Sequence, residues 1–339
     1  MKIIVFCPAN TATGGPEVLH QLCYCLRDLG YDSEMYYYNY RKDSYETPVC
    51  ACYAHYENPF STTYIDSEEN ICVVPETMTK EFYNVKKGVK VLWWLSVDNY
   101  ENMINHTHGH IVKNKSVKLL LKEIKYIEHK IYDVTKKDIA FHLVQSEYAR
   151  AYCHSLHIPA IKIHYVSDYL NDSYLLKARE NGRIKKENRV LFNPKKGYEF
   201  TKILINEAPE IEWMPLINLS YDEVVELMQR SKVYIDFGNH PGKDRLPREA
   251  AVNGCCIITG KRGSAAYQED VDIPAEFKFE DRKDLTREII QKIHQIFDSY
   301  EEISPRFDGY RENIFKEPQK FKEDVRETFL SIEKYYRTR

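Results

Sequence analysis

The chain has 339 residues, enough for two domains of ordinary size, and its 43% apolar and 29% charged residues are typical of a soluble globular protein. Its 48 basic and 51 acidic residues leave a net charge of −3, which argues against a general nucleic-acid-binding protein. No apolar run approaches the roughly 20 residues that a membrane-spanning helix needs.

The first thirty residues predict a strand, a glycine-containing turn and a helix. The apolar run from Lys2 to Cys7 starts without a basic leader and is typical of a strand buried on both faces of a parallel sheet. Gly14 and Gly15 lie in the turn, and apolar residues at helical spacing then continue to Gly30. Without the G-x-G-x-x-G or Walker spacing, this glycine pair is weak evidence for a nucleotide site, and a plain strand-to-helix turn is the alternative.

Alternating strand and helix patterns continue through the first half and predict a mainly parallel sheet. The expected strands are 33–40, 48–53, 71–75, 89–95, 139–144 and 161–166. Glu76 and Asp98 follow two of these strands, at the edge where a doubly wound fold binds its ligands. Each is a candidate for acceptor binding or proton transfer, and capping of the next helix is the alternative.

Two segments of the first half carry histidines or dense charge. His106, His108 and His110 have no acidic ligand nearby, so we do not expect a metal site there, and contact with phosphate or an acceptor is an alternative to an ordinary loop. Residues 116–137 predict an amphipathic helix with a basic face. Such a face is usually solvated, and attraction to anionic lipid is the functional alternative.

A second series of strands and helices follows a hinge at residues 167–172. Its expected elements are the strand 189–193, the helix 198–206, the strand 212–216, the helix 221–230 and the strand 233–237, with helices after residue 284 that break near Pro305 and Pro318. Lys196 and Gly197 stand where a helix start would bind a diphosphate, although solvent-exposed lysines on a turn are the alternative. We therefore predict an α/β fold with two Rossmann-like, doubly wound parallel-sheet domains, residues 1–170 and 171–318.

The stretch 233–260 reads as strand, loop, short helix and strand. Arg245, Arg248 and Glu249 stand at the start of the helix, at the ligand-binding edge of the predicted sheet. Two cations beside one carboxylate suit a phosphorylated, hydroxyl-bearing ligand such as a sugar nucleotide. The alternative is that these charges pair with one another in a buried helix.

This stretch resembles the donor-binding segment of glycosyltransferases with the GT-B fold, in particular the retaining, nucleotide-sugar-dependent group 1 (family 4-like) enzymes with an E-x7-E motif. The matching residues are Leu246-Pro247, Glu249-Ala250, Asn253-Gly254 and the strand 256–258. The resemblance implies that Glu249 holds the donor ribose. Pro241 stands where the first glutamate of the motif would be, so the group that touches the sugar ring is left open.

The resemblance also implies where the rest of the ligand lies. It assigns the donor diphosphate to the Lys196-Gly197 turn and the glycine turn near residue 263, the base to the strand end near residue 215, and the Gly14-Gly15 turn to the cleft between the domains. It further implies that residues 319–339 form a helix crossing back to the first domain. The expected donor-binding residues are Gly14, Gly15, Asn193, Lys196, Gly197, Pro215, Leu216, His240, Arg245, Arg248, Glu249, Gly263 and Ser264.

We therefore expect a glycosyltransferase that moves a sugar from a nucleotide-sugar donor to a glycan or lipid-linked glycan, in bacterial surface polysaccharide biosynthesis. Lys196 and Arg248, with Arg245, would offset the charge of the leaving diphosphate, so neither a metal ion nor a cofactor is expected. The D-x-D spelling at Asp270 and Asp272 is discounted as a metal site because it follows the donor turn in a surface-like stretch.

Stereochemistry and catalysis stay open at this point. An inverting path would use Asp98 or Glu76 as the base, whereas Asp244 or a backbone group in place of the missing glutamate would favour retention. A sugar-nucleotide epimerase and a non-catalytic nucleotide-binding homologue are the alternative functions. Nine cysteines without repeated spacing indicate free thiols in the cytoplasm, so we expect a cytoplasmic protein that can touch the inner face of the membrane.

Overall fold

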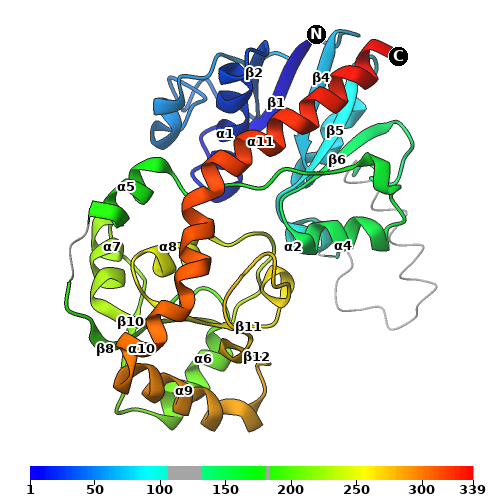
Figure 1. Ribbon diagram of the computed structural model, residues 1–339. Helices are drawn as coiled ribbons and strands as arrows, with labels where there is room; N and C mark the ends of the chain where they lie inside the picture. The colour runs from blue at the N-terminus through cyan, green and yellow to red at the C-terminus, as the bar shows by residue number, and fades with distance from the viewer. Residues whose placement is uncertain (106–130, 181–183, 339) are drawn as a thin grey trace. The chain divides into compact units, whose positions relative to one another are not determined.

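A computed structural model describes residues 1–105, 131–180 and 184–338, and it divides the chain into two compact units (Figure 1). Unit 1 comprises Met1–Asp168 and Lys320–Arg339, and unit 2 comprises Tyr169–Gln319. Each unit has its own parallel sheet and its own buried core. Among the described residues, no helix is both long and apolar enough to cross a membrane.

Unit 1 is built on a seven-stranded parallel sheet in the order β3-β2-β1-β4-β5-β6-β7. Its strands are β1 (Lys2–Pro8), β2 (Ser33–Tyr38), β3 (Phe60–Ser61), β4 (Asn70–Pro75), β5 (Val89–Trp94), β6 (Ile139–Val144) and β7 (Ile163–Tyr165). Its helices are α1 (Gly14–Asp28), α2 (Val97–Asn105) and α4 (Glu147–Ser155), with shorter 3-10 turns η1 (Ala51–Tyr56), η2 (Glu76–Tyr83) and η4 (Ala160–Lys162). Every residue of β4 and β6 is buried, which explains why both strands are apolar apart from Asn70 and His142.

Unit 2 has a five-stranded parallel sheet in the order β12-β11-β10-β8-β9. Its strands are β8 (Glu187–Phe192), β9 (Glu212–Pro215), β10 (Ser231–Asp236), β11 (Cys256–Gly260) and β12 (Lys278–Phe279). Its helices are α5 (Asp172–Glu180), α6 (Tyr198–Glu207), α7 (Tyr221–Arg230), α8 (Arg245–Val252), α9 (Thr286–Asp298), α10 (Tyr300–Ile303) and the first part of α11 (Asp308–Thr338), with 3-10 turns η5 (Gly263–Ala266), η6 (Ala275–Phe277), η7 (Lys283–Leu285) and η8 (Ser304–Phe307).

Both sheets are wound in two directions from an inner strand. The chain goes from β1 to β2 on one side and later enters β4 on the other side, and in unit 2 it goes from β8 to β9 and then to β10. Such switch points are where open parallel sheets bind ligands, beyond the carboxyl ends of the strands. The predicted α/β class with two doubly wound parallel sheets is confirmed.

Helix α11 belongs to both units. Its second part packs on unit 1 through Phe321, Val325, Phe329 and Ile332, all of which are buried. Lys322 pairs with Asp28 at 2.5 Å, and the ring of Tyr335 meets that of Phe141 edge-on at 5.3 Å. The helix break expected near Pro318 is wrong, because α11 runs through this proline. Proline removes a single N–H donor, and the buried apolar residues on both sides outweigh that loss.

Other predictions differ from the structure or lie outside it. The strand expected at 48–53 is wrong, because residues 51–56 form the 3-10 turn η1 instead. The turn is favoured because Tyr53 is buried beside His20, at 4.7 Å between ring centroids, and its hydroxyl donates to the Thr13 carbonyl at 2.6 Å. His106, His108, His110 and most of the expected amphipathic helix 116–137 lie outside the described residues.

Candidate functional site

Three loops of unit 2 pack on one another beyond the carboxyl ends of β8, β10 and β11. Gly197 and Gly263 have positive φ angles of 61° and 54°, which favour glycine. A Cβ at Gly197 would overlap the carbonyl group of Phe237, and one at Gly263 would overlap that of His240. Glycine is therefore required for backbone contact between these loops, and this contact fixes where their side chains point.

Lys196 lies in the β8–α6 loop and reaches the β10–α8 loop. Asn193 shapes its turn, because the Asn193 side-chain oxygen accepts the Lys195 N–H at 3.0 Å and its carbonyl accepts the Lys196 N–H at 3.2 Å. The Lys196 Nζ lies 2.8 Å from Asp244 Oδ1, and its side chain is about one-third exposed. Burial raises the pKa of Asp244, although the charge of Lys196 opposes this shift.

Helix α8 carries Arg245 and Glu249 on neighbouring turns. The Arg245 Nη2 lies 3.1 Å from Glu249 Oε1, and the arginine side chain is 33% exposed whereas the glutamate is 10% exposed. The caps of α6 and α8 are Gly197 and Asp244, and neither makes a side-chain capping hydrogen bond. Helix starts without a side-chain cap attract anions, and two of them lie at this sheet edge beside Lys196 and Arg245, each of which is paired with a carboxylate.

Arg248 is fully buried and faces away from solvent. Its Nη1 pairs with Glu317 Oε2 on α11 at 2.8 Å, and its Nη2 donates to the Lys243 carbonyl at 3.0 Å. The Lys243 Nζ pairs with the other Glu317 oxygen at 2.7 Å. This geometry gives Arg248 a structural role, tying the loop to α11, in place of the ligand contact expected from the sequence.

His240 and Ser264 are also fully buried. The Ser264 hydroxyl donates to the Gly242 carbonyl at 2.7 Å, and its N–H donates to the His240 carbonyl at 2.9 Å. These contacts lie on the buried side of the loop. Neither the His240 nor the Ser264 side chain is therefore accessible to a donor. Pro215 and Leu216 are half-buried at the end of β9, where the Leu216 N–H donates to the Phe192 carbonyl at 2.8 Å.

In unit 1, Gly15 and Glu76 lie around Leu95. A Cβ at Gly15 would be 3.9 Å from Leu95 Cδ1, and Gly14 next to it is exposed at the first residue of α1. The Leu95 N–H donates to Glu76 Oε2 at 2.9 Å. Burial raises the pKa of Glu76 to about 7, and hydrogen bonds from backbone N–H groups oppose the shift. Glu76 thus bridges the ends of β4 and β5 and is itself inaccessible.

Asp98 lies in the first turn of α2 and is partly exposed. Its Oδ1 accepts a hydrogen bond from the Tyr148 hydroxyl at 2.7 Å. Of the two acids predicted in this half, Asp98 is the one with access to solvent. The Asp270–Asp272 stretch is occupied by protein contacts: Asp270 is buried, and Asp272 accepts hydrogen bonds from Gln268 and Asn313.

No protein-family model matches the sequence, and no curated protein sequence matches it. Solved structures match the described fold over nearly the whole chain. HepE of Anabaena in complex with UDP-glucose has a TM-score of 0.58 and 10% identity, and the match covers 98% of this chain and 100% of that one. A glycosyltransferase from Rickettsia africae has a TM-score of 0.58 and 12% identity, covering 99% and 98%.

WaaG, a glycosyltransferase involved in lipopolysaccharide biosynthesis, has a TM-score of 0.54 and 10% identity, covering 95% of this chain and 99% of that one. The chain has the GT-B fold. The resemblance inferred from residues 233–260 is thereby confirmed at the level of fold. At identities this low, the roles of individual residues cannot be transferred from these proteins. The comparison therefore establishes the fold, and the site is inferred from the local geometry of this chain.

Sequence reasoning missed Asp236 and Glu317, and it considered Asp244 only as a replacement for the missing glutamate. Asp236 is the last residue of β10 and Asp244 stands at the N-cap position of α8, and the spacing D-x3-H-x3-D is a signal that could have grouped both with His240. Glu317 pairs with both Lys243 and Arg248, although it lies 69 residues after Arg248 in the sequence. No local pattern marks Glu317, because its role depends on where α11 packs.

Proposed function

We propose that the chain is a glycosyltransferase that moves a sugar from a nucleotide-sugar donor to a glycan or glycoconjugate acceptor. The observation that carries the proposal is that the Lys196–Asp244 and Arg245–Glu249 pairs stand at the starts of α6 and α8, neither of which has a side-chain cap, in a GT-B fold. HepE, which has the same fold, was solved with UDP-glucose, and this supports a nucleotide-sugar donor.

Each group has a distinct task in this proposal. The Lys196 ammonium and the Arg245 guanidinium attract the diphosphate, together with the N–H groups at the two helix starts. Glu249 accepts hydrogen bonds from the ribose hydroxyls. As the glycosidic bond breaks, negative charge accumulates on the leaving diphosphate, and fixed cations stabilise that charge without a metal ion in contact with the donor.

The acceptor side is assigned to unit 1. Asp98 is the better placed base, because it is partly exposed, while Glu76 is buried and held by the Leu95 N–H. The acceptor that we propose is a growing bacterial surface polysaccharide or its lipid-linked precursor. The fold of WaaG, which takes part in lipopolysaccharide biosynthesis, supports this choice.

A screen of nucleotide sugars tests the proposal. The preferred donor at 100 times its dissociation constant should stabilise the protein by about 2.7 kcal/mol, which a thermal-shift assay detects. The same donor is then incubated with the protein and a panel of glycan acceptors, and products are followed by mass spectrometry. Transfer or slow donor hydrolysis is expected. Epimerised donor, or binding without any turnover, would contradict glycosyl transfer.

A further inference from the structure

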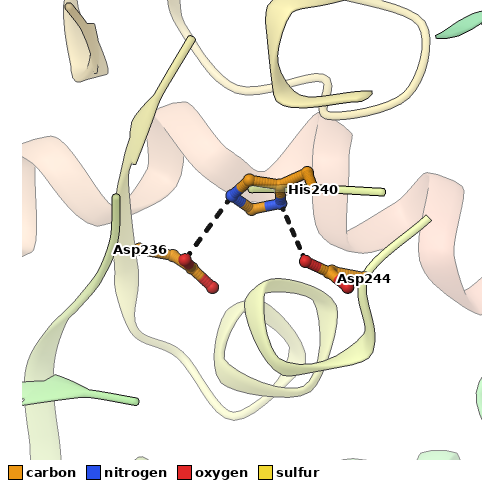
Figure 2. A group of neighbouring side chains, drawn as sticks. All are labelled: Asp236, His240 and Asp244. Carbon is orange, nitrogen blue, oxygen red and sulfur yellow. Dashed lines mark ion pairs between the residues drawn. The ribbon is translucent and has the colours of Figure 1, made fainter. Parts of the chain in front are cut away.

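Asp236, His240 and Asp244 form a cluster at the base of the β10–α8 loop (Figure 2). Asp236 is the last residue of β10, Asp244 caps α8, and His240 lies midway between them in sequence. One potential ligand atom from each residue lies within 4.8 Å of the other two. The cluster therefore joins a strand end, a loop and a helix start.

Three polar atoms of this cluster are buried without hydrogen bonds. His240 is fully buried, and within the described part of the chain neither of its ring nitrogens has a hydrogen-bond partner, nor does Asp244 Oδ2. Figure 2 shows the imidazole between the two carboxylates, with Nδ1 3.2 Å from Asp244 Oδ2 and Nε2 3.6 Å from Asp236 Oδ1. Such orphaned atoms destabilise the folded state, and native proteins usually satisfy them with water or an ion.

The charges of the cluster do not balance. Asp244 pairs with the Lys196 ammonium, but Asp236 is held by two neutral donors, the Tyr234 hydroxyl at 3.1 Å and the Gly238 N–H at 2.9 Å. Two buried carboxylates thus face a single ammonium ion. An uncompensated charge in a buried site destabilises the folded state, so a further cation beside His240 would stabilise the loop.

We infer that Asp236, His240 and Asp244 bind a divalent transition-metal ion, with Zn²⁺ as the best match. One imidazole nitrogen with two carboxylate oxygens is a donor set of zinc and related ions, whereas Mg²⁺ and Ca²⁺ prefer oxygen ligands alone. Tetrahedral bonds of about 2.1 Å place ligand atoms about 3.4 Å apart. His240 Nδ1 and Asp244 Oδ2 are 3.2 Å apart, close to this separation, and one potential ligand atom from each of the three residues lies within 4.8 Å of the other two.

The ion would be structural. Because His240 is fully buried, a metal beside it lies beneath the loop and does not contact the donor. It would fix Asp244, and through the 2.8 Å ion pair it would fix Lys196. This inference does not rest on the proposed function, since a metal that shapes the loop would be present whether or not the chain transfers sugar.

A second proton on His240 is the rival source of positive charge. Each ring nitrogen faces a different carboxylate, so a doubly protonated imidazole could donate to both, whereas a metal takes only one nitrogen. The metal content of the protein distinguishes the two cases, because only the first requires a bound metal ion.

The first test is the metal content of the full chain, made without a histidine tag, supplied with Zn²⁺ during expression and desalted in buffer free of chelator. Mass spectrometry of the elements should find one equivalent of zinc per chain in the wild type. His240→Asn and Asp236→Asn should lose it, with circular dichroism to show that each variant is folded.

A matched control tests whether zinc binds to other histidine and cysteine side chains of the protein. His106, His108 and His110 could bind zinc, and so could Cys50 and Cys52, whose sulfur atoms lie 2.9 Å apart. A variant with His106→Ala, His108→Ala, His110→Ala, Cys50→Ser and Cys52→Ser should keep the ion. Cobalt in place of zinc should show the spectrum of nitrogen and oxygen ligands without a thiolate charge-transfer band.

Two results would overturn the inference. One is a wild-type chain without bound transition metal, in which the ¹⁵N resonances of His240 show both ring nitrogens protonated. The other is an equivalent of zinc that survives in folded His240→Asn. If both variants fail to fold, a wild-type chain without bound transition metal still overturns the inference, and so does loss of the zinc in the variant that lacks the three histidines and two cysteines.

Discussion

Glu249 offers the sharpest test at the scale of single residues. Hydrogen bonds to a charged group contribute roughly 1.5–3 kcal/mol, so Glu249→Gln should weaken binding of the preferred nucleotide by that amount if its carboxylate holds the ribose. Titration calorimetry measures the change. Glu226→Gln removes an exposed partner of Arg230 on α7 and is the matched control, which should bind like the wild type. Equal affinity in Glu249→Gln would take this residue out of the site.

Lys196 should affect turnover more than binding. Removing one donor that stabilises a developing charge typically lowers kcat by roughly 10²–10³, and Lys196→Ala is expected in that range with little change in KM. Lys196→Arg should also turn over poorly, because a planar guanidinium does not replace a point charge in a turn packed against Gly238. Steady-state kinetics measures both, with the exposed neighbour variant Lys195→Ala as control. Normal turnover of Lys196→Ala at saturating donor would assign the lysine to loop structure.

Glu76 should make the stability of the protein depend on pH. Burial raises its pKa from 4.5 to about 7, so the folded chain holds this proton more tightly than the unfolded chain. The free energy of unfolding therefore falls as the pH rises between these two values, and stays lower above them. Glu76→Gln does not titrate and can still accept the Leu95 N–H, so relative to the wild type it should gain about 3 kcal/mol across this window.

Urea unfolding at the two ends of that window, near pH 4.5 and near pH 8, measures the effect. The diagnostic quantity is the change in the difference between the two proteins, since the substitution also alters packing by an amount that does not vary with pH. A difference that stays constant across the window would show that Glu76 ionises alike in the folded and unfolded chains.

At the scale of elements, the link between α8 and α11 is a buried ion network. Glu317→Gln removes the carboxylate that pairs with Arg248 and Lys243, and breaking a buried pair in this way costs about 3–5 kcal/mol. Denaturant unfolding should show this loss. Glu312→Gln on the same helix is the control. Glu312 Oε2 lies 3.8 Å from Lys316 Nζ, both side chains are exposed, and exposed pairs of this kind contribute little to stability. Similar stability of the two variants would argue against the network.

The elements that sequence periodicity could predict are those with strong local patterns. The expected helix 221–230 has the bounds of α7, and the expected strand 139–144 has those of β6. The 3-10 turn at 51–56 and the unbroken α11 could not be predicted in this way, because each depends on burial against residues far away in sequence.

The same distinction holds for the candidate site. The residue types at its edge, Lys196 and Arg245 with Glu249, could be read from spacing and resemblance. Which arginine is accessible could not be predicted, because Arg245 and Arg248 are one helical turn apart. Arg248 is buried in contact with Glu317, which is far away in sequence. His240 likewise looks like a ligand-facing loop residue until its two aspartates are placed around it.

At the scale of the whole molecule, the two units should respond differently to nucleotide. Hydrogen exchange followed by mass spectrometry should show the largest gain in protection at residues 193–200 and 240–249, because the proposed contacts lie in these loops. Peptides from the sheet of unit 1 serve as the internal reference. A gain centred in unit 1 would place the nucleotide in the other sheet and contradict the assignment of Lys196 and Glu249.

Helix α11 also has a consequence for how the chain acquires its structure during synthesis. Residues 320–338 complete unit 1, yet the ribosome makes them after all of unit 2. Domains generally fold as units in the order in which they emerge. The N-terminal sheet is therefore synthesised before the helix that completes its unit. Until that helix is made, the apolar surface that it covers is exposed to water, whereas unit 2 can already fold. The residues that later cover this surface are Phe321, Val325, Phe329 and Ile332. The domain started first is thus finished last, and this interval is when the nascent chain is most exposed to aggregation and to chaperones.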